Sequence, residues 1–255
     1  MIQEHLADGR HILIGDRKLF ANVSGSAHAA PSVILLGGGG GTTSTWTEIQ
    51  AAVSGFAPVL SYDRAGLGQS DAAREPQSLD EMLKDLLILI AEARLEPPFV
   101  LVGHSVGGLH ARRLAETFPR DVAGIVLVDS SHDEQVWRLG AACPEILESE
   151  YGPIWRDADE MQRLGWLLDG ARSTWRLDVP LIVIEHRRRG RTNPFPSLPE
   201  EIFLAFEDAW HEMQQDLATR SSLGELREAA HSGHAICSSQ PELVVEAIRD
   251  ILARR

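Results

Sequence analysis

Residues 99–108 read Phe-Val-Leu-Val-Gly-His-Ser-Val-Gly-Gly, and this stretch decides the fold. Its apolar start predicts a buried strand, and apolar residues at helical spacing follow it at Leu109, Leu114 and Phe118. The turn between them is a G-x-S-x-G pattern centred on Ser105. Such a turn holds its serine in a strained backbone conformation and lifts the hydroxyl clear of the sheet edge. The stretch therefore predicts strand, sharp turn and helix, with Ser105 as a candidate nucleophile.

The rest of the chain alternates apolar strands with helical patterns. We expect an opening hairpin of strands 10–14 and 18–23, further strands at 33–36, 59–62, 122–128, 179–184 and 226–230, and helices at 47–53, 79–93, 200–219 and 241–252. This alternation predicts βαβ units and a mostly parallel sheet, an α/β fold. Residues 133–177 break the rhythm with four tryptophans (Trp137, Trp155, Trp166 and Trp175) and no strand pattern.

Composition limits the classes of function. The chain has 255 residues, 44% of them apolar, which fits one domain with a sizeable core. Its formal net charge of −13 argues against nucleic acid or an anionic membrane surface as a partner. The sequence carries no apolar run long enough to span a membrane and no signal-peptide pattern, so a cytoplasmic protein is expected. Cys143 and Cys237 fit no metal or redox spacing, and no cofactor or metal is expected.

A run of five glycines, residues 37–41, follows the apolar strand 33–36. A phosphate-binding loop needs Lys and then Ser or Thr after its last glycine, whereas Thr42 and Thr43 follow here. The spacing also fails G-x-G-x-x-G. A turn that presents bare backbone N–H groups fits the run better.

Four motifs in this order resemble those of the α/β-hydrolase family. They are the glycine turn, the Asp63-Arg64-x-Gly-x-Gly-x-Ser70 turn, the elbow at Ser105, and Ser232-Gly233-His234 before the last helix. The resemblance covers essentially the whole chain. It implies an eight-stranded, mostly parallel sheet flanked by helices, with a helical cap of about residues 133–177 inserted after the strand that ends at Asp129. The commonest substrates of the family are esters, amides and thioesters.

The same resemblance implies roles for single residues. Ser105 would be the nucleophile and His234 the general base that takes its proton. The oxyanion hole would use the backbone N–H groups of Val106 and Gly39. Here the chain departs from the common family motif, which has His-Gly directly after the strand. Of the other histidines, His231 is the second candidate base and His104 is interpreted as a packing residue.

The acid of the triad is the largest departure from the family pattern. The usual acid lies a few residues after the strand 179–184, where this chain has arginines. Some members carry the acid one strand earlier, the place of Asp129 here. A carboxylate that closes a fully apolar strand needs a partner, and His234 would supply one. Asp133, and Glu185 or a more remote acid, remain the alternatives.

These residues predict a serine hydrolase that cleaves a small-molecule carboxylic ester or thioester through an acyl-enzyme. The fold also supports other functions, so a lyase, a tailoring enzyme or a binding protein with a retained triad are the alternatives. Haloalkane dehalogenase and epoxide hydrolase chemistry are disfavoured because they need a carboxylate where Ser105 stands. Four arginines within residues 187–191 could attract an acidic substrate, but a solvated loop is the favoured interpretation.

Overall fold

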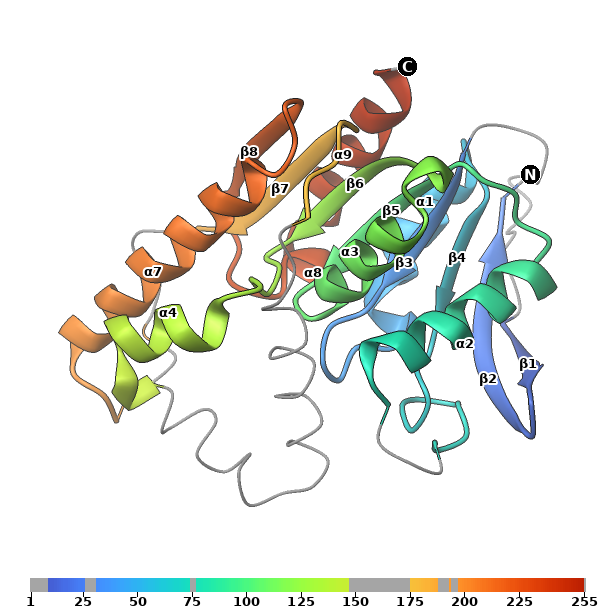
Figure 1. Cartoon of the computed structure of the whole chain (residues 1–255), viewed down its shortest axis with the longest axis horizontal. Helices are drawn as coiled ribbons and strands as arrows, with labels where there is room; N and C mark the ends of the chain where they lie inside the picture. Colours follow the sequence, from blue (N-terminus) through green and yellow to red (C-terminus); the bar gives the residue numbers. More distant parts are fainter. Residues whose placement is uncertain are drawn as a thin grey trace.

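The computed structural model describes residues 9–25, 31–73, 77–146, 175–187, 193 and 197–254. Eight strands form one sheet in the order β1-β2-β4-β3-β5-β6-β7-β8 (Figure 1). The strands are β1 (Arg10–Ile14), β2 (Arg17–Ser24), β3 (Ser32–Leu36), β4 (Val59–Tyr62), β5 (Phe99–His104), β6 (Val122–Val128), β7 (Leu181–His186) and β8 (Gly224–Ala229). β2 runs antiparallel to β1 and β4, and every other pairing is parallel. The predicted eight-stranded, mostly parallel sheet is confirmed.

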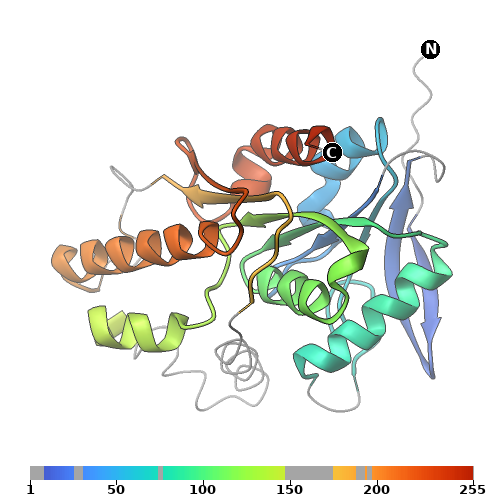
Figure 2. The ribbon, with the colours of Figure 1, turned by 45° about the horizontal axis from the view of Figure 1, so that its top comes forward.

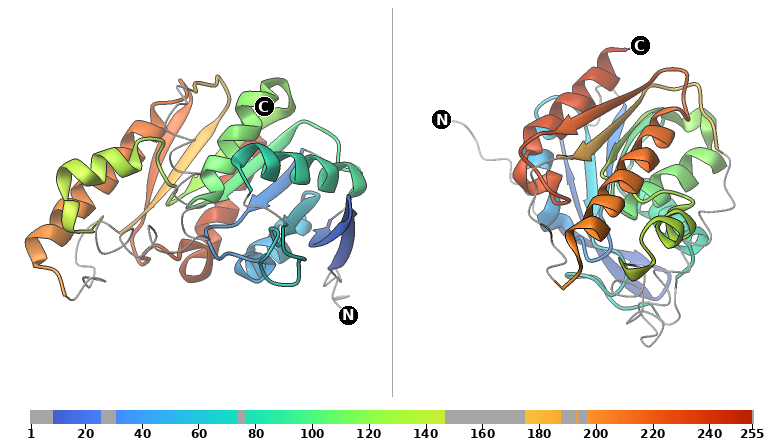
Figure 3. Two further views of the ribbon diagram at one scale, coloured as in Figure 1. Left: turned by 60° about the horizontal axis from the view of Figure 1, so that its bottom comes forward. Right: turned by 90° about the vertical axis from the view of Figure 1, so that its left-hand side faces the viewer.

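Helices cover both faces of this sheet (Figure 3). The described helices of eight or more residues are α1 (Thr47–Ser54), α2 (Leu79–Glu92), α3 (Gly107–Thr117), α4 (Gln135–Ala142), α7 (Glu200–Ala218) and α9 (Pro241–Ala253). Shorter ones are η1 (Thr43–Trp46), η2 (Pro119–Asp121) and α8 (Ile236–Ser239). α2 begins with a capping box in which the Ser78 hydroxyl accepts from the Glu81 N–H.

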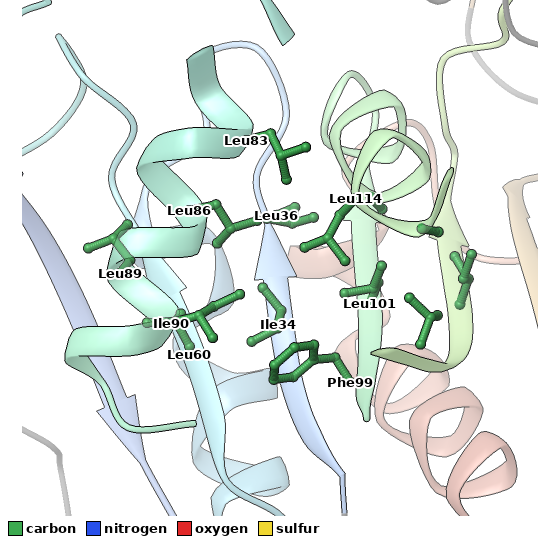
Figure 4. Packing of buried hydrophobic residues seen from close by; sticks show 14 of the residues in the cluster. Ile34, Leu36, Leu60, Leu83, Leu86, Leu89, Ile90, Phe99, Leu101 and Leu114 are labelled. Carbon is green, nitrogen blue, oxygen red and sulfur yellow. The ribbon is translucent and has the colours of Figure 1, made fainter. Parts of the chain in front are cut away.

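Alternating side chains of the buried strands build two cores. Ile34 and Leu36 of β3 belong to the core beneath α2 and α3, where they pack with Leu86 and Leu114 (Figure 4). Val33 and Leu35 belong to the opposite core, which α1 and α9 cover. Because successive strand residues point to opposite faces, a parallel strand between two helical layers is apolar throughout. This explains why the apolar runs predicted the strands.

The structure moves β7 by two residues from its expected range of 179–184. Pro180 precedes the strand, and proline has no N–H to give to a sheet ladder. At the other end, Glu185 and His186 continue the parallel pairing with Glu228 and Ala229 of β8. Both residues therefore belong to the strand, and the side chain of His186 lies at the edge of the sheet where the candidate site forms.

The expected cap segment, about residues 133–177, is described in part. Within it, α4 lies beside α7 at the end of the sheet that carries β7 and β8 (Figures 1 and 2). Trp137 on α4 is exposed, whereas Trp175 is buried in the core with α2 and α3. Residues 147–174, with Trp155 and Trp166, lie outside the described residues. In the part of the chain that the structure describes, no helix is long and apolar enough to cross a membrane.

Candidate active site

The candidate residues gather at the carboxyl ends of the parallel strands. Ser105 follows β5 directly, Asp129 follows β6, and the glycine turn follows β3. His234 lies between β8 and α8. Ligands of open α/β sheets bind at this edge. The strand order places β5 between β3 and β6, so the serine lies between the glycine turn and the aspartate.

The elbow at Ser105 has the backbone that its sequence predicts. Ser105 has a φ of 54°, in the left-handed region that side chains rarely adopt. A Cβ atom on Gly103 would lie 2.6 Å from the carbonyl oxygen of Gly107, and one on Gly107 would lie 2.1 Å from that of Leu36. The Ser105 N–H donates to Val128 O over 3.1 Å. The two glycines are therefore required, and the elbow is tied to the end of β6.

Asp129 and His234 face each other across this edge. His234 Nδ1 lies 2.6 Å from Asp129 Oδ2, a charge-assisted hydrogen bond in which the ring nitrogen donates. The aspartate is fully buried, while the imidazole is 46% exposed. The ring of His104, the residue before Ser105, packs on the ring of His234 with 4.8 Å between centroids. The structure thus brings the histidine to both the acid and the elbow.

Asp129 is held by more than His234. Its Oδ1 atom also accepts from Trp210 Nε1 over 2.8 Å and from the His186 N–H over 3.2 Å. His186 Nδ1 lies 2.9 Å from Oδ2. Burial alone would raise the pKa of Asp129, but the hydrogen bonds from His186 and His234 outweigh it and hold the pKa well below its usual range. The carboxylate therefore stays ionised without contact with water.

The alternative acids face other partners. Asp133 Oδ1 forms a buried salt bridge of 2.9 Å with Arg112, and its Oδ2 accepts from Trp175 Nε1 over 3.3 Å. Glu185 lies 2.7 Å from His211 Nδ1. Neither carboxylate is among the described partners of His234. The geometry therefore favours Asp129 over both alternatives for contact with the histidine.

His104 forms a hydrogen bond in addition to its packing contact with His234. Its Nε2 atom donates to the carbonyl oxygen of His234 over 2.9 Å. Burial lowers the pKa of His104 to about 4, and the neighbouring His234 adds to this effect. His104 is therefore a neutral ring at pH 7 and supports the backbone of the loop that carries His234.

Arg64 holds the glycine turn. Its guanidinium donates to the carbonyl oxygens of Gly37 over 2.5 Å and Gly39 over 2.7 Å, and it also donates to Gly38 O. In a trans peptide the C=O and the N–H point in opposite directions. The N–H of Gly39, which shares a peptide with Gly38 O, therefore points away from Arg64. A Cβ atom on Gly38 would lie 3.2 Å from Ser105 Cβ, so this turn borders the elbow.

The turn that begins at Asp63 holds the loop that carries Arg64. Asp63 Oδ1 accepts from the Thr43 N–H over 2.7 Å, and Oδ2 accepts from the Gln69 N–H over 2.9 Å. Gly68 has a φ of 52°, and a Cβ atom there would lie 2.1 Å from Asp63 Oδ2. The motif thus serves to fix the loop beside the elbow.

Three further residues belong to this site and were not predicted from the sequence: His186, Glu207 and Trp210. Glu207 and Trp210 lie on one face of α7, at the i, i+3 spacing that places side chains side by side. Both are buried. For the two residues on α7, the sequence did offer a signal: a glutamate, Glu207, interrupts the apolar face of the helix.

Two further features of the sequence, the arginine cluster and the possible metal ligands, add little to the candidate site. Four of the five positions 187–191 lie outside the described residues; Arg187 is described, and its N–H donates to Ser232 O over 3.0 Å. Among the described residues, no group of three or more His, Cys, Asp or Glu side chains has the geometry to hold a metal ion.

Comparisons with known proteins agree with this architecture. A model of the alpha/beta hydrolase family matches residues 33–247. An uncharacterized Bacillus subtilis protein, YqjL, is 23% identical over 82% of this chain and 79% of its own length. A thermophilic esterase from Thermogutta terrifontis superposes with a TM-score of 0.66 at 19% identity, covering 97% of this chain and 99% of its own. The enol-lactonase from Burkholderia xenovorans superposes with a TM-score of 0.64 at 20% identity, covering 96% of this chain and 100% of its own. The chain belongs to the alpha/beta hydrolase family.

Proposed function

We propose that the protein is a serine hydrolase that cleaves a small-molecule carboxylic ester or thioester. Ser105 is the nucleophile, His234 the general base and Asp129 the acid. The observation that carries the proposal is the hydrogen bond of 2.6 Å between His234 Nδ1 and Asp129 Oδ2 beside the strained elbow at Ser105. A serine hydroxyl becomes a useful nucleophile only when a neighbouring base takes its proton, and His234 is the base that we propose.

The first half of the reaction forms an acyl-enzyme. The Ser105 hydroxyl oxygen attacks the carbonyl carbon of the substrate while His234 Nε2 takes the hydroxyl proton. The carbonyl π electrons move to oxygen, and the N–H groups of Val106 and Gly39 stabilise the negative charge that develops there. Collapse of this tetrahedral intermediate breaks the bond to the leaving alcohol or thiol, which takes its proton from His234.

The second half repeats these steps with water. Water attacks the acyl carbon and gives its proton to His234, the bond to the Ser105 oxygen breaks, and the serine recovers that proton. A carboxylic acid leaves. Throughout, the buried Asp129 carboxylate keeps His234 Nδ1 protonated, so that Nε2 is the atom that accepts a proton, and stabilises the imidazolium when it forms.

A chemical probe tests the class of protein directly. The purified chain is treated with a fluorophosphonate, and the labelled peptide is identified by mass spectrometry. Labelling of Ser105 that is lost in Ser105→Ala and kept in Ser222→Ala is expected, since Ser222 lies in the turn before β8. Hydrolysis of p-nitrophenyl esters of graded chain length then separates a hydrolase from a binding protein with a retained triad. An unlabelled Ser105 and no ester turnover would overturn the proposal.

A further inference from the structure

Asp129 contacts two imidazoles, and the proposed reaction uses one of them. His186 contacts the same carboxylate as His234, with Nδ1 at 3.0 Å from Oδ1 and 2.9 Å from Oδ2. The side chain of His186 is 5% exposed, so it is removed from solvent together with the carboxylate. Trp210 stacks on this ring, with 6.4 Å between centroids and 27° between planes.

The far nitrogen of His186 meets a second buried carboxylate. His186 Nε2 lies 3.1 Å from Glu207 Oε2 and 3.3 Å from Oε1. The Glu207 side chain is 3% exposed. A neutral imidazole has one N–H and would turn the lone pair of its other nitrogen toward a carboxylate. When both acids are ionised, only the imidazolium can donate a hydrogen bond to each of them.

The charge on His186 agrees with this geometry. Burial opposes the charged form, but the hydrogen bonds to Asp129 and Glu207 outweigh burial and raise the pKa of His186 to about 9. Among the described groups at this edge, Glu185 on β7 interacts electrostatically with both His186 and Asp129. His104, at the end of β5, and Cys237 on α8 interact with Asp129. Glu185 and His211 bind each other, so that pair carries little net charge toward His186.

We propose that His186 is a positioning residue: held as an imidazolium between Asp129 and Glu207, it fixes the Asp129 carboxylate against His234 and offsets part of the negative charge that His234 meets. This inference rests on the proposed function, because it gives the role of Asp129 to the pair Asp129 and His234. It adds a chain of alternating carboxyl and imidazole groups, from Glu207 through His186 and Asp129 to His234, that reaches from α7 to the loop after β8.

The charges in this chain make opposite predictions for two substitutions. Without the cation of His186, two carboxylates act on His234, which then holds its proton to higher pH. Without the charge of Glu207, the cation of His186 is less compensated, and His234 loses its proton at lower pH. A double substitution restores the net charge. Opposite shifts that cancel are the signature of an electrostatic role, because loss of packing would act in one direction.

The test compares His186→Gln, Glu207→Gln, their combination, and a matched control in which Glu185→Gln and His211→Gln are combined. The control removes the neighbouring pair as a whole, so the net charge beside His186 and Asp129 is kept. The pH dependence of kcat/KM for a p-nitrophenyl ester is measured for each. We expect the acidic limb of this profile to move up by about one pH unit in His186→Gln, to move down in Glu207→Gln, and to return to the parent position when these two are combined. The control should leave the acidic limb in place.

A second measurement does not need turnover. In protein labelled with ¹⁵N-histidine, the ring nitrogens of His186 should both carry protons at pH 7.5, and the His234 titration should move in the variants as the acidic limb does. A neutral His186, an unmoved titration in His186→Gln, or an equal shift in the control that lacks both Glu185 and His211 would overturn the inference. If Ser105 is unreactive and no ester is cleaved while His186 is doubly protonated and the titrations shift as expected, the proposed function fails and the inference about His186 stands. Should His186→Gln not fold, Glu207→Gln and the spectrum of the parent protein decide the question.

Discussion

His234 Nδ1 and Asp129 Oδ2 lie 2.6 Å apart although their residues are 105 positions apart in the chain. The acid is fully buried and the imidazole is 46% exposed, so the hydrogen bond orients a ring that solvent reaches. Because Nδ1 is engaged inside the protein, Nε2 is the nitrogen left for a proton from outside. The contact requires β6 and the loop after β8 to be in place together, so the proposed base is assembled only by the complete fold.

Replacing the proposed nucleophile or base should abolish turnover. Ser105→Ala and His234→Ala are each expected to lower kcat by roughly 10⁴-fold or more, because the groups of a triad act as a unit. The Ser105 and His234 side chains are not core residues, so thermal unfolding should change little. Turnover of a p-nitrophenyl ester and circular dichroism measure the two effects. Activity near that of the parent in either variant would contradict acyl-enzyme catalysis.

Asp129→Asn tests the acid. Asparagine tolerates the φ of 43° at this position, so the backbone should be kept. We expect kcat to fall by about 10⁴-fold because the amide no longer fixes the proton on His234 Nδ1. Asp133→Asn is the matched control: its carboxylate binds Arg112, so it should lose stability and keep most of its kcat. The reverse pattern would make Asp133 the acid.

The buried imidazolium of His186 makes stability depend on pH. Its pKa is raised from 6.5 to about 9 in the folded protein. A raised pKa means that the folded state binds the proton more tightly, so this stabilisation is complete below about pH 6.5 and is lost as the pH rises through about 9. The difference in free energy of unfolding between parent and His186→Gln should therefore shrink by about 3 kcal/mol over this window. Urea unfolding at several pH values measures it. A difference that stays constant with pH would show a neutral His186.

Arg64→Gln should impair the oxyanion hole more than substrate binding. The guanidinium binds three successive glycine carbonyls and so holds the Gly39 N–H in place. Loss of one well-placed oxyanion donor lowers kcat by about 10²-fold or more, and KM should change much less. Arg113→Gln is the control, since Arg113 is exposed and pairs with Asp80. An unchanged kcat in Arg64→Gln would remove the glycine turn from the proposed mechanism.

Two glycines in neighbouring turns should respond differently to alanine. A Cβ atom on Gly107 would lie 2.1 Å from Leu36 O, a contact with backbone that cannot give way, whereas one on Gly40 would meet nothing within 4 Å. We expect Gly107→Ala to cost at least about 3 kcal/mol of stability. Gly40→Ala should stay within about 0.5 kcal/mol. Thermal unfolding of the two variants checks this, and equal melting temperatures would refute the close approach of the elbow to β3.

The sheet and the elbow were predictable because their signals are local. Each central strand is an apolar run, and the positions of Gly103 and Gly107 follow from the shape of one turn. Asp129 could be proposed because some members of the family that the chain resembles carry the acid at this place, and because a carboxylate at the end of an apolar strand needs a partner. β7 begins later than expected because Pro180 has no N–H to donate to the ladder. The apolar pattern alone does not show which residues can donate.

The second carboxylate and its histidine could not be predicted in this way. The contact between His186 and Glu207 joins a strand to a helix 21 positions later, and Trp210 reaches Asp129 across 81 positions. Both contacts depend on the rotation of α7 about its axis and on where it crosses the ends of β6 and β7. Periodicity indicates that the helix has a buried face but not which polar group that face will meet.

The position of Asp129 at the end of β6 has an evolutionary consequence. With a carboxylate already facing His234 from that strand, the proposed triad needs no acid after β7, and the strand can end in His186. Under the proposed function, selection on the acid then acts on the turn after β6, where Asp129 is buried and accepts from His234, His186 and Trp210. The sequence after β7 is released from that requirement and can change in length and charge among descendants.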